Sequence, residues 1–347
     1  LAARRGEQGF RLGLDAATIG TLEVRGRRIE LAVIDGGGSS AADALAAAYR
    51  AGKADLAVSF ASSEATLALL PVAASFKRLL LVAEAGADAI TGSEHGRYVF
   101  RTAASRRQLA SAETLALARP ELNLFVVAEN TRDGTDAVAA LKAALARHPT
   151  GAFFVGARLV PPDGSDIGDL VSAEFEALHD LHGAKTLLLA WAGAGPPIPA
   201  IAATNPGGIG MRLAFAGDID PDAPPPGIEI EGVTSYYHTL PRNRVNDGFV
   251  TAWRDHYHEP PDGFAAGGMT AALALVAALK AAPAMATETL VATMEGMRFE
   301  TPKGVMIFRR DDHQALQVIY RFRSEPGAHG GRPALVHEFA IPELRSD

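Results

Sequence analysis

A glycine and serine run, Gly36–Ser40, is the first segment whose residue types could support chemistry. It follows an apolar run and precedes an alanine-rich one, which is where a phosphate-binding loop would lie. The run has neither the dinucleotide-binding nor the Walker spacing, and glycine at a strand-to-helix turn is ordinarily a backbone requirement. The pattern therefore favours a plain turn over a nucleotide site.

Histidines suggest two further possibilities. His256, His258 and Glu259 are close enough to suggest a metal site, but they end an expected helix just before two prolines, where histidine suits the helix C-terminus. His313 lies between Asp312 and Gln314 in an expected turn, and a structural role is favoured there too. With no nucleophile elbow and no carboxylate pair in a supporting motif, the case for an enzyme is thin.

Two serines, Ser62 and Ser63, close one apolar run and open a helical one. Serine suits a helix N-cap, and the free N–H groups of a first helical turn form an anion site. A cap alone is one interpretation. Ligand binding is the other, and it is favoured because ligands of open α/β sheets bind beyond the carboxyl ends of the strands. We expect Ser63 to cap the helix and to donate a hydrogen bond to a ligand oxygen.

Apolar runs of strand length alternate with alanine-rich helical stretches, which is typical of βαβ units in a doubly wound sheet. The expected strands are Ile29–Ile34, Leu56–Phe60, Leu79–Ala83, Leu124–Ala128, Phe153–Leu159, Thr186–Trp191 and Leu213–Ala216. The expected helices between them are Ala41–Ala51, Ser63–Phe76, Arg107–Ala118, Thr135–Ala146 and Leu170–His182. One sheet holding every strand would be unusually wide, so two sheets are expected.

The C-terminal part departs from this alternation. Three helices are expected at Val245–Tyr257, Phe264–Ala282 and Thr287–Met297, and a β-hairpin is expected from Val305–Phe308 and Gln317–Phe322. The proline-rich stretch Pro221–Pro226 is interpreted as an exposed loop.

Composition excludes several classes of protein. With 347 residues, 48% of them hydrophobic and 21% charged, the chain can bury the cores of two lobes. A net charge of −7 without a long basic run argues against binding to nucleic acid or to an anionic membrane. The absence of cysteine excludes disulfides and thiolate metal sites. No signal peptide opens the chain, so in an exported protein we expect one to have been removed, together with an N-terminal strand.

Several segments together resemble one known family, the type I periplasmic binding proteins of the branched-chain amino acid transporter group, the Leu/Ile/Val-binding proteins. The most specific is Phe299–Tyr320, FETPKGVMIFRRDDHQALQVIY, which resembles the closing segment of the family. The other similar segments are Asp55–Ser63, Tyr98–Thr102 (YVFRT), Ala190–Gly195 (AWAGAG), Ala216–Asp218 (AGD) and Pro261–Met269.

The resemblance implies a Venus-flytrap fold, in which two doubly wound, Rossmann-like α/β lobes are joined by three crossovers and the ligand binds between them. The first lobe would hold residues 1–101 and 236–299, and the second would hold residues 102–235 and 300–347. Hinge closure would follow from contacts of the ligand with both lobes.

The resemblance also implies a set of ligand-binding positions. Ser63 matches the serine that holds the ligand carboxylate, with Ser62 and Glu64 beside it. Glu84 matches a backbone-carbonyl position, and Gly86, which follows Ala85, stands where the family has threonine. Thr131 stands where a tyrosine is usual. Trp191 matches a common aromatic wall, and Asp218 lies near the acidic position that meets the ligand ammonium group.

The function implied is that of an extracytoplasmic receptor that captures an amino acid, amide or aromatic acid and passes it to an ABC permease. We expect a monomer without a cofactor, in the periplasm or at the outer face of a bacterial membrane. Because Glu64, Glu84 and Asp218 would surround the ligand, we expect a nitrogen beside its carboxyl or carbonyl group. The alternatives are a sensor or regulatory module of the same fold and an α/β enzyme that uses a nucleotide.

Overall fold

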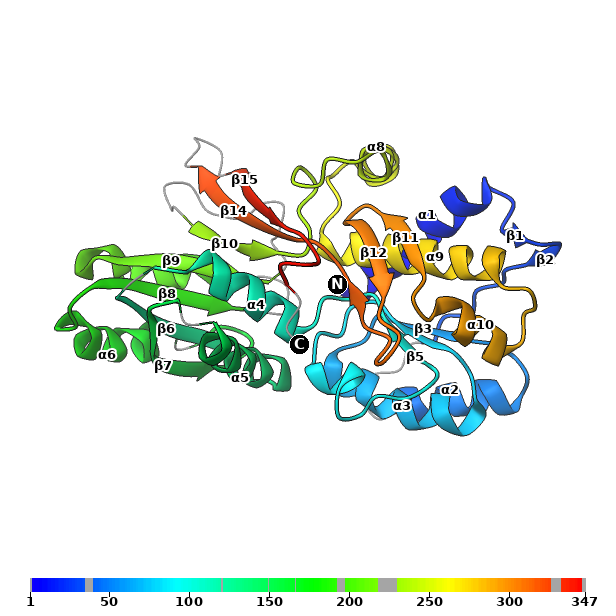
Figure 1. Cartoon of the computed structure of the whole chain (residues 1–347), viewed down its shortest axis with the longest axis horizontal. Helices are drawn as coiled ribbons and strands as arrows, with labels where there is room; N and C mark the ends of the chain where they lie inside the picture. The colour runs from blue at the N-terminus through cyan, green and yellow to red at the C-terminus, as the bar shows by residue number, and fades with distance from the viewer. Residues whose placement is uncertain are drawn as a thin grey trace. The chain divides into compact units, whose positions relative to one another are not determined.

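The computed structural model describes residues 2–34, 40–119, 121–148, 150–165, 167–191, 197–217, 230–325 and 332–344. The chain forms two compact units (Figure 1). Unit 1 comprises residues 1–105 and 241–317, and unit 2 comprises residues 106–240 and 318–347, so the chain passes between the units three times. The expected lobe boundaries, after residues 101, 235 and 299, differ from these most at the third passage.

Unit 1 has a parallel sheet with three described strands, β3 (Ala57–Ser59), β4 (Leu80–Val82) and β5 (Val99–Arg101), in that order. α2 (Ser40–Arg50) and α3 (Ser63–Phe76) pack together, and residues from both share a buried cluster with β4 and β5. Leu80, Leu81 and Val82 are fully buried, as expected of a central parallel strand. A single helical turn, η1 (Asp88–Thr91), lies between β4 and β5.

The other core of unit 1 is built on α1 (Ala2–Thr18) and α9 (Gly263–Ala281). Gly6 and Gly9 of α1 and Gly268 of α9 bring the two helices into very close contact, since a Cβ added at Gly268 would lie 1.9 Å from the backbone oxygen of Gly6. α8 (Arg244–Tyr257) and α10 (Thr287–Met294) complete the helices of the unit. A short hairpin follows α1, and its two antiparallel strands, β1 (Glu23–Val24) and β2 (Arg27–Arg28), have two residues each.

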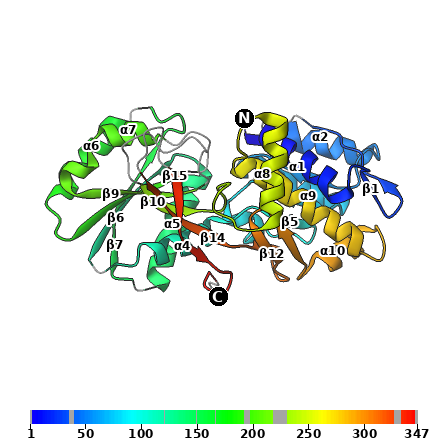
Figure 2. The same ribbon diagram turned by 90° about the horizontal axis from the view of Figure 1, so that it is seen from above.

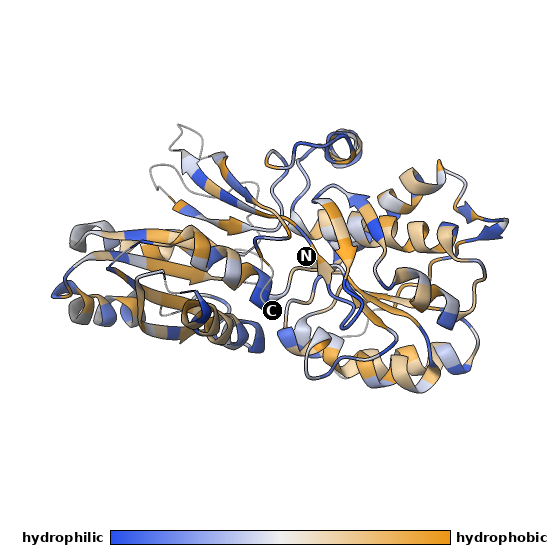
Figure 3. Cartoon of the chain, viewed as in Figure 1, coloured by the Kyte–Doolittle hydropathy of each residue, from blue (hydrophilic) through white to orange (hydrophobic). Residues whose placement is uncertain are grey.

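By length and composition α9 could cross a membrane, but 67% of its apolar window is buried in the protein. It packs against α1 and carries many of the buried residues of unit 1. Figure 3 shows the apolar colour of α9 beside the hydrophilic β1 and β2. The helix is therefore accounted for as a core element of unit 1.

The expected strand Ile29–Ile34 is wrong. These residues form neither helix nor strand, and Leu31, Val33 and Ile34 are 40%, 61% and 40% exposed. An apolar run becomes a strand only when a neighbouring strand supplies hydrogen-bond partners for its backbone. None of the described strands pairs with Ile29–Ile34.

The expected hairpin of Val305–Phe308 with Gln317–Phe322 is confirmed in its turn around Asp311 and Asp312 and wrong in its second strand. β12 (Gly304–Phe308) pairs instead with β11 (Arg298–Thr301) and with the short β13 (Ala315–Leu316), all in unit 1. The next strand, β14 (Ile319–Glu325), belongs to unit 2. Residues 300–317 therefore lie in unit 1, not in the second lobe as expected, because β11 and β12 contribute Phe299, Met306 and Phe308 to the core around α9.

Unit 2 is built on a seven-stranded sheet in the order β15-β14-β10-β9-β8-β6-β7. Its strands are β6 (Leu122–Glu129), β7 (Ala152–Val160), β8 (Ala184–Ala190), β9 (Met211–Ala216), β10 (Ile230–Thr234), β14 and β15 (Arg332–Phe339). β6 to β10 are parallel, whereas β14 and β15 join as antiparallel strands.

Helices cover both faces of this sheet, which confirms the expected doubly wound arrangement (Figure 2). α4 (Arg106–Ala116) and α5 (Arg132–Arg147) pack together on one face, and α6 (Ile167–His179) and α7 (Ile198–Ala203) pack together on the other. A short turn, η2 (Pro206–Ile209), precedes β9.

Glu113 is an unusual member of the unit 2 core. It lies on α4, is 0% exposed, and its two carboxyl oxygens have no hydrogen-bond partner among the described residues. Burial raises the pKa of Glu113 well above its ordinary value, and the nearby charge of Glu231 raises it further, while Arg321 opposes the shift. Glu231 itself accepts hydrogen bonds from Arg119 and Arg323. Burial therefore favours the neutral form of the Glu113 side chain in the folded protein.

We expect Glu113→Gln to remove a pH-dependent loss of stability. In the unfolded chain a glutamate ionises near pH ~4.3, so above that pH unfolding releases a proton that the folded protein retains. The wild-type free energy of unfolding should fall by about 1.4 kcal/mol per pH unit up to the raised pKa, relative to the variant. Urea unfolding of both proteins between pH 5 and pH 8 measures the difference. Glu30→Gln, at an exposed position, is the control; parallel pH profiles of Glu113→Gln and wild type would contradict a neutral Glu113.

Candidate functional site

The junction between β3 and α3 is a helix N-terminus capped by serine. Ser62, not the expected Ser63, is the N-cap, and its Oγ accepts a hydrogen bond from the backbone N–H of Ala65 at 3.4 Å. The cap falls one residue earlier because Ser63 already has helical geometry as the first residue of α3. Ser62 and Glu64 are exposed, so the first turn of α3 presents polar groups at the carboxyl end of β3.

Ser63 joins this helix start to the loop after β4. Its side chain is 1% exposed, and its Oγ accepts a hydrogen bond from the backbone N–H of Ala87 at 3.0 Å. β3 and β4 are paired in parallel, with Ser59 opposite Val82, so their carboxyl ends lie side by side. The structure thus brings together the expected positions around Ser63 with Glu84, Ala85 and Gly86. Ala87, the residue that makes the contact, was not expected.

The two glutamates of this region lie in different surroundings. Glu64 is exposed in the first turn of α3, where a carboxylate complements the positive end of the helix. Glu84 lies against α1, since a Cβ added at Gly6 would fall 2.0 Å from its Oε1, which is buried. Its side chain is therefore packed against another helix.

Unit 2 has a similar strand-to-helix junction after β6. Thr131 is the N-cap of α5, and its Oγ1 accepts a hydrogen bond from the backbone N–H of Gly134 at 3.2 Å. Gly134 is required there because a Cβ would lie 1.9 Å from the backbone oxygen of Glu129. Arg106 of α4 forms an ion pair with Asp133 at 3.3 Å beside this turn.

Trp191 follows β8 directly, at the carboxyl end of the same sheet. Its side chain is 1% exposed and belongs to the core cluster of unit 2, and its backbone N–H donates to the oxygen of Ala216 at 3.2 Å. The indole Nε1 is buried and has no hydrogen-bond partner in the part of the chain that the structure describes. Asp218, expected nearby, lies outside the described residues.

The histidine candidates have structural roles. His258 ends α8 with a φ of 59°, and Glu259 pairs with Arg5 of α1. His313 is 3% exposed, stacks on Phe100 with ring centroids 3.9 Å apart, and its Nδ1 lies 3.0 Å from the oxygen of Val99. No metal-binding group of three acidic, cysteine or histidine residues occurs among the described residues. Residues 36–39 of the glycine and serine run, and Pro221–Pro226, lie outside them.

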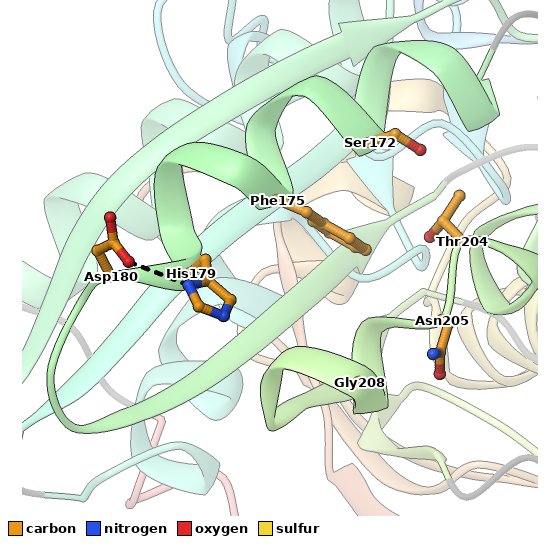
Figure 4. A pocket seen from close by; sticks show the side chains of 7 residues that line it. All are labelled: Ser172, Phe175, His179, Asp180, Thr204, Asn205 and Gly208. Atoms are coloured by element: carbon orange, nitrogen blue, oxygen red, sulfur yellow. Dashed lines mark hydrogen bonds and ion pairs between the residues drawn. The ribbon is translucent and has the colours of Figure 1, made fainter.

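A cavity of 580 Å³ lies elsewhere in unit 2 (Figure 4). It is lined by Ser172, Phe175, His179, Asp180, Thr204, Asn205 and Gly208. His179 and Asp180 follow one another at the end of α6, just before β8, and Gly208 precedes β9. The cavity therefore lies towards the amino ends of the strands, opposite Thr131 and Trp191, and holds none of the expected site residues.

Comparisons with known proteins agree on one family. A family described as periplasmic binding proteins matches residues 2–329. No curated protein sequence matches the chain. Among solved structures, a branched-chain amino acid ABC transporter protein from Rhodopseudomonas palustris CGA009 is 38% identical, with a TM-score of 0.85 over 99% of this chain and 94% of that one.

Two less similar structures share the fold. A solute-binding protein from Rhodopseudomonas palustris BisB5, in complex with 3,4-dihydroxybenzoic acid, is 20% identical, with a TM-score of 0.84 over 98% of this chain and 93% of that one. A leucine-, isoleucine-, valine-, threonine- and alanine-binding protein from Brucella ovis is 16% identical, with a TM-score of 0.81 over 100% of this chain and 92% of that one.

Proposed function

Because the chain belongs to the periplasmic binding protein family, with the type I fold of that family, we propose that it is the solute-binding receptor of an ABC importer. Its ligand is a small carboxylate: an amino acid, an amide derivative or an aromatic acid. The receptor holds this ligand without changing it and delivers it to a membrane permease from the periplasm or the outer face of the membrane. No cofactor takes part.

The observation that carries this proposal is the junction of Ser63 with Ala87 in unit 1. It holds the exposed first turn of α3 beside the loop Glu84–Gly86, at adjacent carboxyl ends of parallel strands. Free N–H groups of a first helical turn bind carboxylates well. Ser62 and the backbone of the first turn of α3 supply the ligand contact, while Ser63 holds the loop in place.

Unit 2 has proposed ligand contacts of its own. The buried indole N–H of Trp191 is a hydrogen-bond donor without a partner among the described residues, which is a costly arrangement unless something else accepts it. A ligand oxygen is a suitable acceptor. Thr131 and Asp218 remain proposed ligand contacts of unit 2.

The choice between an amino acid and an aromatic acid depends on the acidic residues. Glu64 is exposed and Glu84 packs against α1, so these two carboxylates do not require a ligand ammonium group between them. A branched-chain amino acid transporter protein is the relative at 38% identity, whereas the aromatic acid is bound by a protein that shares 20% identity. Both classes therefore belong in the test.

The test is a thermal-shift screen with matched pairs, each an amino acid and its nitrogen-free acid, together with benzoate and 4-hydroxybenzoate. A ligand at 100 times its Kd stabilises the native protein by about 2.7 kcal/mol. For units of this size, each kcal/mol of stabilisation raises the Tm by roughly 2–4 °C. Calorimetry on each hit then gives the Kd. A panel at millimolar concentration that leaves the Tm of the folded protein unchanged would contradict the proposal.

A further inference from the structure

Arg101 is a buried arginine at the end of β5 that sequence reasoning did not select. It is 1% exposed. Its Nη1 donates to the backbone oxygen of Ala87 and, at 3.4 Å, to that of Ala85, and its Nη2 donates to Oγ1 of Thr91 at 2.6 Å. The guanidinium thus holds the segment Ala85–Thr91, which is the loop after β4 together with η1, at three points. Two of them are backbone carbonyls next to the proposed ligand contacts.

Ser63 holds the same loop from the other side. Ala87 donates its N–H to Ser63 and accepts a hydrogen bond from Arg101 at its oxygen. Both polar groups of one backbone residue are therefore fixed by side chains from two different strand ends. The position of this loop relative to α3 is set by these contacts.

Gln314 connects the guanidinium to the segments through which the chain leaves unit 1. Its Oε1 accepts from Nε of Arg101 at 2.5 Å and from Oγ1 of Thr91 at 3.2 Å. Its Nε2 donates to the oxygens of Ala103 at 2.9 Å and Ala315 at 2.8 Å. Because an amide offers two acceptor and two donor positions, Gln314 is fully satisfied in this one arrangement.

The segments tied together in this way are two of the three crossovers. The chain enters unit 2 after Ser105 and again after Gln317. One backbone contact and one further side-chain contact add to these links. The backbone N–H of Arg101 donates to the oxygen of His313 at 3.1 Å, and the side-chain Nε2 of Gln317 donates to the backbone oxygen of Thr102 at 3.2 Å. The ligand loop and both crossovers thus share one buried hydrogen-bond network.

We propose that Arg101 is a positioning residue that, through Gln314, couples the loop Ala85–Thr91 to the two crossovers. This proposal rests on the proposed function in one respect, which is that the loop Ala85–Thr91 contacts the ligand. A ligand that contacts the loop then acts on the segments that lead to unit 2, and a change in those segments alters the loop. The planar guanidinium suits this role because it reaches acceptors in several fixed directions at once, which a lysine ammonium on a flexible stem does not.

The first experiment tests the coupling without any ligand, by hydrogen exchange of the full chain. Gln314→Glu keeps an acceptor for Arg101 and Thr91 but places a carboxylate oxygen against the carbonyls of Ala103 and Ala315, so it cuts the crossover side of the network. We expect amide exchange at least about tenfold faster in 101–105 and also in 85–91, where Gln314 makes no contact with the backbone. An unchanged rate in 85–91 would overturn the proposal.

Two further variants separate coupling from a general loss of stability. Val291→Ala, in the α10 core of the same unit, lowers global stability without touching the network and should leave the ratio of loop to global exchange unchanged. Thr91→Val removes a hydroxyl from the loop end of the network and should accelerate exchange in 101–105, the reverse direction. If Val291→Ala matches Gln314→Glu at equal stability, Arg101 is merely structural.

A ligand readout completes the test, with 4-hydroxybenzoate and leucine as the probes. For any probe that stabilises the wild type, Arg101→Lys should weaken affinity at least about tenfold more than Val291→Ala does. Equal losses in the two variants would contradict the positioning role. If neither probe binds the wild type, the exchange experiment still decides the coupling, and only the proposed function is affected.

Discussion

Replacing Gly268 with alanine should destabilise unit 1 severely. The added Cβ would lie 1.9 Å from the backbone oxygen of Gly6 and 2.7 Å from the backbone nitrogen of Phe10. Backbone atoms cannot rotate away as a side-chain end can, so α1 and α9 would have to move apart along their whole contact. We expect a loss at or above the top of the ~1–3 kcal/mol range for overpacked cores, despite the better helix propensity of alanine. The Tm should fall by about 6–12 °C.

Gly248→Ala is the matched control, because it is the same substitution in a helix of the same unit. No atom lies within 4 Å of a Cβ at Gly248 in α8. Alanine there should stabilise the protein by about 0.5–1 kcal/mol through the lower entropy of the unfolded chain. Urea unfolding of the two variants should give shifts of opposite sign. Shifts of the same sign would show that the close contact of α1 with α9 is not present in solution.

The local sequence pattern predicted those elements for which both the apolar period and the residues at the two ends are characteristic. The helix Ser63–Phe76 was expected with the bounds that α3 has, because a serine start, an apolar period and the following lysine mark it. The run Ile29–Ile34 has an equally apolar pattern and is not a strand, because pairing depends on a partner that the run itself does not specify. Strand partners are the part of a fold that a local pattern leaves open.

The third passage between the units was misplaced for the same reason. Val305–Phe308 and Gln317–Phe322 are consecutive apolar runs around two aspartates, which is typical of a hairpin. The chain does form a hairpin there, but its second strand is the short β13, where Ala315 pairs with Phe308. Phe322 belongs to the next strand and pairs with Gly232 of β10 in unit 2. The passage to unit 2 follows this hairpin directly, so only the tertiary partners show where the hairpin ends and the next strand begins.

The candidate site was predictable at its backbone and not at its side chains. The strand-to-helix junction pointed to Ser63 and the family resemblance to Thr131, and in the structure both lie where a helix begins after a strand. The sequence could not show that Ser63 accepts from Ala87, nor that Arg101 reaches the oxygens of the same loop. Those contacts depend on side chains from different strands, and a buried arginine has no pattern that separates it from an exposed one.

Trp191→Phe should weaken ligand binding much more than it weakens the fold. The indole Nε1 is buried and has no partner among the described residues, so its removal costs the ligand-free protein no hydrogen bond to them. If the ligand accepts this N–H, the variant loses that hydrogen bond in the complex, which corresponds to about a tenfold or greater rise in Kd. Calorimetry with the hits of the thermal-shift screen measures the change.

Trp253→Phe is the matched variant, because Trp253 is also buried, at 0% exposed, and its Nε1 also lacks a partner among the described residues. It lies in α8 of unit 1, packed against Phe249 and Tyr257, at a helix that contributes no expected ligand-binding residue.

Since the chain has two tryptophans, Trp253→Phe leaves Trp191 as the single tryptophan, and Trp191→Phe leaves Trp253. Added ligand should change the fluorescence emission of Trp253→Phe, and the titration should give the wild-type affinity. The emission of Trp191→Phe should not change when ligand is added. A ligand response that follows Trp253, or equal losses of affinity in both variants, would remove Trp191 from the site.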